Sequence, residues 1–203
     1  FIGAAIYAST GPSWVFVLNA LSFGFVIISL LRVTLPPPVS TGSQGLHRLL
    51  EGFEVARADR VVGQCLIVIF SFSFLCLPFI SLMPVLADAN LGIESKSTAY
   101  GVLYACFGLG AVIGALSIGT VFAHRSKAAL TRVGLIAFAV MIAVFGSLHV
   151  RLPAYLAIML LGCVYFAVIT SLSTVLQEKL DDSVRGKVMA LWITGFGGTV
   201  PFG

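Results

Sequence analysis

Five long stretches of this chain contain no charged side chain, and the connections between them carry the charges. A helix needs an apolar stretch of about 20 residues to cross the hydrocarbon core of a bilayer. The uncharged stretches are Phe1–Leu31, Val61–Ala87, Ser97–Ala123, Val133–Val150 and Leu152–Gln177. A sixth begins at Val188 and reaches the last residue, Gly203. This pattern predicts an all-α protein whose helices cross a membrane several times.

Basic residues fall mainly on alternate connections, and this gives the orientation of the predicted spans. One set of connections holds ten of the 12 basic residues: Arg32, Arg48, Arg57, Arg60, Arg125, Lys127, Arg132, Lys179, Arg185 and Lys187. The other set holds Lys96 and Arg151. Because cytoplasmic loops carry an excess of lysine and arginine, we place the first set in the cytoplasm. The net charge of +4 follows from this orientation, so we expect no nucleic-acid partner.

The composition agrees with a membrane protein and sets limits on its chemistry. Hydrophobic residues make up 59% of the chain and charged residues 10%, against about 25% charged residues in ordinary soluble domains. The chain begins with Phe1 rather than methionine, and both ends lie inside apolar stretches, so we expect a fragment with helices missing at both ends. Cys65, Cys76, Cys106 and Cys163 lie singly without CxxC spacing. We expect them to be buried hydrophobes, with no metal, disulfide or cofactor.

Turn residues and prolines place the ends of the individual spans. Ser9–Ser13 interrupts the first stretch, so Phe1–Ala8 is expected to end one span and Ser13–Leu31 to form the next. Pro36–Pro38 ends any helix, and the polar segment Val39–Gly45 is expected to be a flexible link. The remaining spans are expected at Val61–Leu86, Tyr100–Ala123, Val133–Leu148, Pro153–Leu176 and Val188–Gly203. Two outer segments, Asp88–Ser97 and His149–Leu152, and one inner segment, Gln177–Lys187, are expected to connect them. In the inner segment, Asp182 or Ser183 is placed to cap the next helix.

The segment Leu46–Arg60 differs from the spans, because its apolar residues follow one face of a helix. These residues are Leu46, Leu49, Leu50 and Phe53. The amphipathic helix is expected either to lie on the cytoplasmic membrane surface or to pack against the ends of the bundle. It belongs to the longest polar connection, which we take as the boundary between two helical halves. The chain then divides into 1–31, the end of an N-terminal half; 32–60, a cytoplasmic central loop; and 61–203, a truncated C-terminal half.

Small, kinking and polar residues within the spans suggest how the helices pack. Gly110 and Gly114 form a GxxxG pattern, which lets two membrane helices approach closely. Pro78 and Pro84 are expected to kink their helix, either to allow motion or merely to shape the packing. The polar residues at depth are neutral: Ser71, Ser73, Tyr165, Thr170, Ser171 and Ser173. They can hydrogen-bond between helices, or as a set they can line a cavity for a mostly apolar solute.

Chemistry typical of membrane enzymes and channels is absent from this sequence. No acid or base lies within the core of any predicted span, and neither HExxH, GxSxG nor a filter resembling TVGYG occurs. His124 and His149 lie at span ends without a partner acid or cysteine nearby, so we interpret them as solvated loop residues. We therefore do not expect an enzyme.

Three segments carry a resemblance to a known family. The most specific is Gln177–Met189, in which a glutamine is followed by acidic residues and then by Arg185, Gly186 and Lys187. The others are Glu51–Asp59 and Val15–Phe23. Together and in this order they resemble the major facilitator superfamily, in particular the branch of bacterial exporters that includes the enterobactin exporter and macrolide efflux pumps. One departure is Ala123, which occupies the aspartate position of the superfamily's basic loop motif.

The resemblance implies a helical bundle of the major-facilitator type, covering the end of the fifth to the start of the eleventh of twelve helices. It implies a multi-pass protein of the bacterial plasma membrane that is a monomer when full length. Its partners would be the lipid bilayer, a small-molecule substrate and protons. Its function would be proton-coupled efflux of small, largely apolar molecules, drug-like or siderophore-like, by alternating access. A non-transporting scaffold or sensor on the same fold, and a membrane enzyme with its catalytic group in the missing helices, are the alternatives.

The resemblance also implies roles for individual residues. The seventh and tenth helices would face the substrate cavity, which makes Ser73, Phe74 and Tyr165 candidates for its lining. The candidates for a cytoplasmic gate, where cations would pair with acids or helix carboxyl ends, are Arg125, Lys127, Arg185 and Lys187. Since no ionisable group lies at depth in this sequence, we expect the carboxylate that couples transport to protons in the missing first half.

Overall fold

The computed structural model describes residues 12–33 and 46–198, and within these residues every regular element is an α-helix. The helices are α2 (Pro12–Arg32), α3 (Leu46–Ala58), α4 (Arg60–Cys76), α5 (Pro78–Leu91), α6 (Thr98–Gly119), α7 (Lys127–Ser147), α8 (Arg151–Lys179) and α9 (Asp182–Gly198). The predicted span end Phe1–Ala8, the proline run Pro36–Pro38, the link Val39–Gly45 and the last five residues lie outside the described part.

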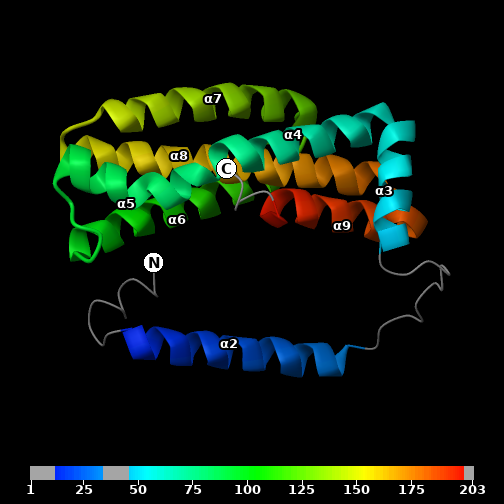
Figure 1. Ribbon diagram of the computed structural model, residues 1–203, viewed down its shortest axis with the longest axis horizontal. Coiled ribbons are helices and arrows are strands. Elements are labelled where there is room, and N and C mark those ends of the chain that lie inside the picture. Colours follow the sequence, from blue (N-terminus) through cyan, green and yellow to red (C-terminus); the bar gives the residue numbers. More distant parts are fainter. Residues whose placement is uncertain (1–11, 34–45, 199–203) are drawn as a thin grey trace.

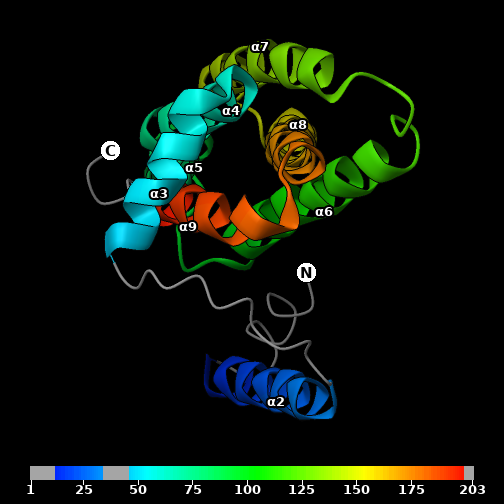
Figure 2. The same ribbon diagram turned by 90° about the vertical axis from the view of Figure 1, so that its right-hand side faces the viewer.

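The helices α4 to α9 form a bundle with roughly parallel axes (Figure 1). Viewed end-on, α4, α5, α6, α7 and α9 surround α8 (Figure 2). The most extensive contacts join α8 to α6 and to α7, while α9 packs on α3 and α4. The helix α3 crosses one end of the bundle, and α2 lies apart from the other helices (Figures 1 and 2). The central position of α8 explains why its buried residues extend over most of its length.

The connections alternate between the two ends of the bundle as the charge pattern predicts. The turns from α3 to α4, from α6 to α7 and from α8 to α9 lie at one end, and those from α5 to α6 and from α7 to α8 lie at the other (Figure 1). The basic end contains Arg60, Lys127 and Arg185, whereas the opposite end contains Lys96 and Arg151. The positive-inside rule predicts that the basic end faces the cytoplasm, and we refer to it as the cytoplasmic end.

Five helical stretches of the described residues are long and apolar enough to cross a membrane: Ser13–Arg32, Arg60–Leu91, Thr98–Gly119, Lys127–Ser147 and Arg151–Lys179. All five were expected, but some of their ends were not. The predicted inner segment Gln177–Lys187 is wrong, because α8 continues to Lys179 and α9 already begins at Asp182. Asp182 therefore lies in the first turn of α9 rather than capping it. Leu176 and Leu180 are buried at this corner, so the connection between α8 and α9 packs against the bundle.

The second span is a pair of helices, α4 and α5, that meet at Leu77. The backbone N–H of Leu77 still donates to the Ser73 carbonyl at 3.3 Å, but Pro78 has no N–H to continue the ladder. Pro78 instead starts α5, where a missing N–H costs nothing. Pro84 lies inside α5 without ending it, and the helix runs on to Leu91. The predicted outer segment from Asp88 is therefore four residues too long at its start.

The helix α3 packs against the cytoplasmic end of the bundle, which was one of the two expected placements. Gly52, Val55 and Ala56 face the bundle. A Cβ on Gly52 would lie 2.8 Å from the carbonyl oxygen of Lys187 in α9, and Val55 and Ala56 pack on the hydrophobic core. Leu50 and Phe53 face outward and are 58% and 63% exposed. These two residues of the predicted apolar face therefore lie on the exposed side of the helix, where Phe53 also borders a groove between α3, α4 and α9.

Candidate functional site

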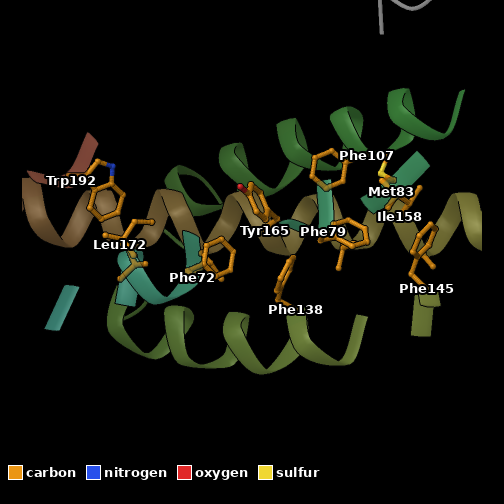
Figure 3. Close-up of a cluster of buried hydrophobic side chains, with 14 of the residues drawn as sticks. Phe72, Phe79, Met83, Phe107, Phe138, Phe145, Ile158, Tyr165, Leu172 and Trp192 are labelled. Carbon is orange, nitrogen blue, oxygen red and sulfur yellow. The ribbon is translucent and has the colours of Figure 1, made fainter. Parts of the chain in front are cut away.

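An aromatic cluster lies in the middle of the bundle, around Tyr165 of α8. The Tyr165 ring lies 5.2 Å from Phe72 of α4, 5.9 Å from Phe107 of α6 and 5.7 Å from Phe138 of α7, measured between ring centroids. Figure 3 shows these rings converging from different helices onto α8. Tilted aromatic pairs at such distances each contribute about 0.5–1.5 kcal/mol beyond their buried area. The cluster therefore holds four helices together at this level.

Two hydroxyl groups are buried in the same helix without a hydrogen-bond partner among the described residues. They are the Tyr165 hydroxyl and the Ser171 Oγ, and the two residues are 2% and 0% exposed. A buried hydroxyl left unsatisfied costs about 1–3 kcal/mol. Such groups call for a physical explanation, such as a water or a solute bound in one state of the protein.

The other two predicted cavity residues lie next to each other in α4 but in different environments. Ser73 is fully buried, and its hydroxyl donates to the Phe196 carbonyl of α9 at 2.6 Å. Phe74 is 46% exposed on the outside of the bundle. Two hollows bounded by described residues lie at opposite ends of the bundle, and neither is lined by Ser73, Phe74 or Tyr165. That these three residues line one substrate cavity stays a prediction.

The predicted gate residue Lys127 caps a helix. Its Nζ donates to the carbonyl of Ile118, in the last turn of α6, at 3.2 Å, and to the carbonyls of Phe122 at 2.7 Å and Ala123 at 2.9 Å in the turn that follows α6. A cation at this position satisfies carbonyls that have no helical partner and opposes the negative end of the helix dipole. Arg125, in the turn between α6 and α7, is exposed. Arg125 and Lys127 therefore differ in role although the sequence places them two residues apart.

Arg185 and Lys187 connect the start of α9 to its surroundings. The Arg185 guanidinium donates to the Leu180 carbonyl at 3.0 Å, beyond the end of α8, and forms an ion pair with Asp182. Lys187 forms an ion pair with Glu51 of α3, and both side chains are largely buried, at 17% and 24% exposed. Arg185 thus joins α8 to α9, and Lys187 joins α9 to α3.

Asp59 links the start of α4 to the end of α8 at the cytoplasmic end. Its carboxylate accepts from the backbone N–H groups of Val61 at 2.8 Å and Val62 at 3.3 Å, so it caps α4. It also lies 3.7 Å from the Lys179 Nζ at the end of α8. The two backbone hydrogen bonds, and then Lys179, hold the pKa of Asp59 below its usual range. Its carboxylate is therefore charged at neutral pH.

The opposite end of the bundle has a cap that sequence reasoning missed. The Arg151 guanidinium, at the start of α8, donates to the carbonyls of Leu91 at 3.1 Å and Gly92 at 2.7 Å, at the end of α5. The Asn90 side chain donates to the Gly146 carbonyl of α7 at 2.7 Å. The end of α5 is thereby fastened to both α7 and α8. The sequence contains one indication of this cap, because Arg151 is one of two basic residues on the predicted outer side.

Comparison with known proteins places the whole chain in one family. A family model described as "Transmembrane secretion effector" matches residues 1–203. The chain belongs to this family of the major facilitator superfamily. The predicted resemblance is thus confirmed, and with it an all-α protein that crosses the inner membrane several times.

Curated relatives match over nearly the full chain but extend well beyond it. The enterobactin exporter EntS of Escherichia coli O81 (strain ED1a) is 27% identical over 194 residues, covering 94% of this chain and 45% of the relative. The protein of the same name from Shigella flexneri is also 27% identical, covering 94% and 44%. This family member therefore spans less than half the length of these relatives. No solved structure matches it.

Proposed function

We propose that the full-length protein is a secondary transporter that exports small, largely apolar molecules, drug-like or siderophore-like, across the bacterial inner membrane. The observation that carries this proposal is the match of all 203 residues to a secretion family, together with relatives named as enterobactin exporters. The absence of acids and bases from the cores of the spans supports an apolar solute, because nothing charged there would hold an ion. Transport would proceed by alternating access and be driven by protons.

In this proposal the residues 61–203 belong to the C-terminal half, residues 1–31 end the N-terminal half, and 32–60 connect the two. The separation of α2 from the bundle of α4 to α9 supports this division (Figure 1). The site would lie between the halves, so this chain would supply one wall of it. The protonated carboxylate would come from the other half, and the full-length protein would act as a monomer.

The candidate lining residues would then have different parts in transport. Tyr165 and the nearby Ser171 would offer their unpaired hydroxyl groups to a solute or water when the helices open. Ser73 would hold α4 to α9 beside the break at Leu77. Phe74, which is exposed in this half, would face either the solute or the opposite half.

The four basic candidates would form the cytoplasmic gate. Lys127 and Arg185 already cap helix carboxyl ends, and Lys187 pairs with Glu51, as expected for residues that fix the cytoplasmic ends of helices in one state. Arg125 is exposed and would pair with an acid of the other half when the gate closes. Opening the gate would exchange these contacts.

Dye accumulation in cells with and without the full-length gene tests the proposed function. Cells that express the protein should retain less of an apolar fluorescent dye, and dissipating the proton gradient should abolish the difference. Unchanged retention across a broad panel of solutes would instead favour a non-transporting scaffold or sensor. Reconstituted protein that alters its solute chemically, rather than moving it intact, would indicate a membrane enzyme.

A further inference from the structure

The cytoplasmic end of the bundle contains an apolar groove, and among the described residues that line it one is a cation, Arg57. The groove has a volume of about 480 Å³ and lies between α3, α4 and α9. Its lining includes Phe53, Arg57, Leu66, Ile67, Phe70 and Leu191. Pockets that bind small molecules have volumes of about 300–1,000 Å³ and combine apolar walls with a few polar groups. This groove has both properties and plays no part in the transport proposal above.

We propose that this groove binds one anionic phospholipid of the cytoplasmic leaflet, with its phosphate at Arg57 and an acyl chain along α4. Basic pockets between helices on the cytoplasmic side are suited to anionic head groups. Arg57 lies in the last turn of α3, the helix that crosses the cytoplasmic end of the bundle, where head groups lie. Among the described residues no acid forms an ion pair with Arg57.

The walls of the groove favour an acyl chain as its apolar occupant. Ile67 and Phe53 are 67% and 63% exposed, although they lie in a cavity wall. Both side chains would be covered by a chain that enters from the bilayer beside α4. Leu50, on the exposed face of α3, is 58% exposed and would rest in the same lipid layer. A zwitterionic lipid could fill the same walls, so the preference for an anionic lipid depends on Arg57.

Close backbone packing joins the helices that bound the groove. A Cβ on Gly63 of α4, which lines the groove, would lie 2.5 Å from the carbonyl oxygen of Ala56 in α3, which also lines it. A Cβ on Gly52 would lie 2.8 Å from the Lys187 carbonyl oxygen, so α3 and α9 touch there. The Lys187–Glu51 ion pair joins the same two helices. The groove is therefore bounded by elements that are fastened to one another, and a lipid bound in it would contact α3, α4 and α9 at once.

Quenching of a tryptophan placed in the groove tests the proposal. The full-length protein carrying Ile67→Trp would be placed in nanodiscs that contain phosphatidylglycerol or phosphatidylcholine brominated on the acyl chains, with the parent protein as background. At equal mole fraction the brominated anionic lipid should quench the added tryptophan more strongly. Adding Arg57→Gln should reduce this preference about fivefold, as expected for loss of one cation at a membrane surface.

Arg132→Gln is the matched control, because Arg132 is an exposed cation at the cytoplasmic end but on α7. It should change the preference at the same tryptophan by less than about twofold, since more distant surface charges are screened. Equal quenching by the two lipids would overturn the proposal. So would no quenching by either, which would show that another part of the full-length protein covers the groove.

Native mass spectrometry of the protein without the tryptophan gives an independent measurement. The protein should retain one phosphatidylglycerol under detergent conditions that strip phosphatidylcholine, and Arg57→Gln should lose it while Arg132→Gln keeps it. Equal retention by the two variants would refute the role of Arg57 whatever the result of the quenching experiment.

Discussion

The close contact between α6 and α8 leads to the most direct test of the packing. A Cβ added to Gly110 would lie 2.8 Å from the carbonyl carbon of Met159 and 2.9 Å from the backbone nitrogen of Cys163, and closer still to the Met159 carbonyl oxygen. Ordinary van der Waals contact begins near 3.4 Å, so the two backbones would have to separate by at least 0.6 Å at this point. The obstructing atoms are backbone, and no side-chain rotation can relieve the clash.

Gly110→Ala should therefore destabilise the full-length protein despite the better helix propensity of alanine. Inserting one carbon into a well-packed contact costs about 1–3 kcal/mol. Gly114→Ala should behave in the same way, because its Cβ would lie 2.7 Å from the carbonyl carbon of Cys163. Gly108, two residues before Gly110 in the same helix, provides the control: a Cβ there meets nothing within 4 Å outside its own helix. Gly108→Ala should stabilise the protein by about 0.5–1 kcal/mol.

The measurement is the free energy of unfolding of the full-length protein in mixed micelles, obtained from SDS titration. Gly110→Ala and Gly108→Ala should differ by about 1–3 kcal/mol, which is the cost of overpacking alone, because both changes gain the same helix propensity. The comparison cancels the effect of alanine on the helix itself. A Gly110→Ala protein as stable as the Gly108→Ala protein would refute the close approach of α6 and α8.

Three further changes test the two ends of the bundle. Arg185→Ala removes the cap beyond α8, so dye efflux by the full-length protein should fall several-fold with unchanged insertion into the membrane; normal efflux would exclude Arg185 from the gate. The pKa of Asp59 is lower in the folded protein than in the unfolded chain, so its charged form stabilises the fold. This stabilisation is fully present above the pKa of Asp59 in the unfolded chain and is lost as the pH falls through its pKa in the folded protein. The Tm advantage of the native protein over Asp59→Ala should thus be constant near neutral pH and shrink below about pH 4, whereas an advantage independent of pH would contradict the capping role. Arg151→Gln should lower stability by about 1–2 kcal/mol in SDS titration and Lys96→Gln by much less, and equal losses would show that the cap on α5 is unimportant.

The spans and their orientation could be predicted because the bilayer imposes them locally. A helix within the hydrocarbon must be apolar over a fixed length, so α6 and α7 can be recognised from their own residues. The same constraint ends at the membrane surface. The polar residues Gln177, Glu178 and Lys179 continue α8 as a helix outside the apolar stretch, and this made the predicted inner segment too long. Charged residues therefore indicate where a span leaves the membrane, but they do not indicate where its helix ends.

The fastening contacts could not be predicted because they join residues that are distant in sequence. Arg151 and Leu91 are 60 residues apart, and Ser73 and Phe196 are 123 apart. No periodicity within one helix indicates such a pair. For Tyr165 the sequence indicates a neutral polar group at depth, but the rings that enclose it come from α4, α6 and α7. The candidate site is therefore predictable as a set of residue types and not as an arrangement.

The positions of the cations suggest how the described helices would move in the proposed transporter. Lys127, Arg151 and Arg185 each donate to carbonyls at a helix end, on α6, α5 and α8 respectively. Bonds of this kind tie neighbouring helix ends together without placing an ion pair in the membrane core. In the proposed mechanism, helices joined in this way would tilt together until the opening of the cytoplasmic gate exchanges the contacts of Lys127 and Arg185. We expect local bending at the α4–α5 junction at Leu77, because Pro78 interrupts the backbone hydrogen bonds there while Arg151 holds the far end of α5 in place.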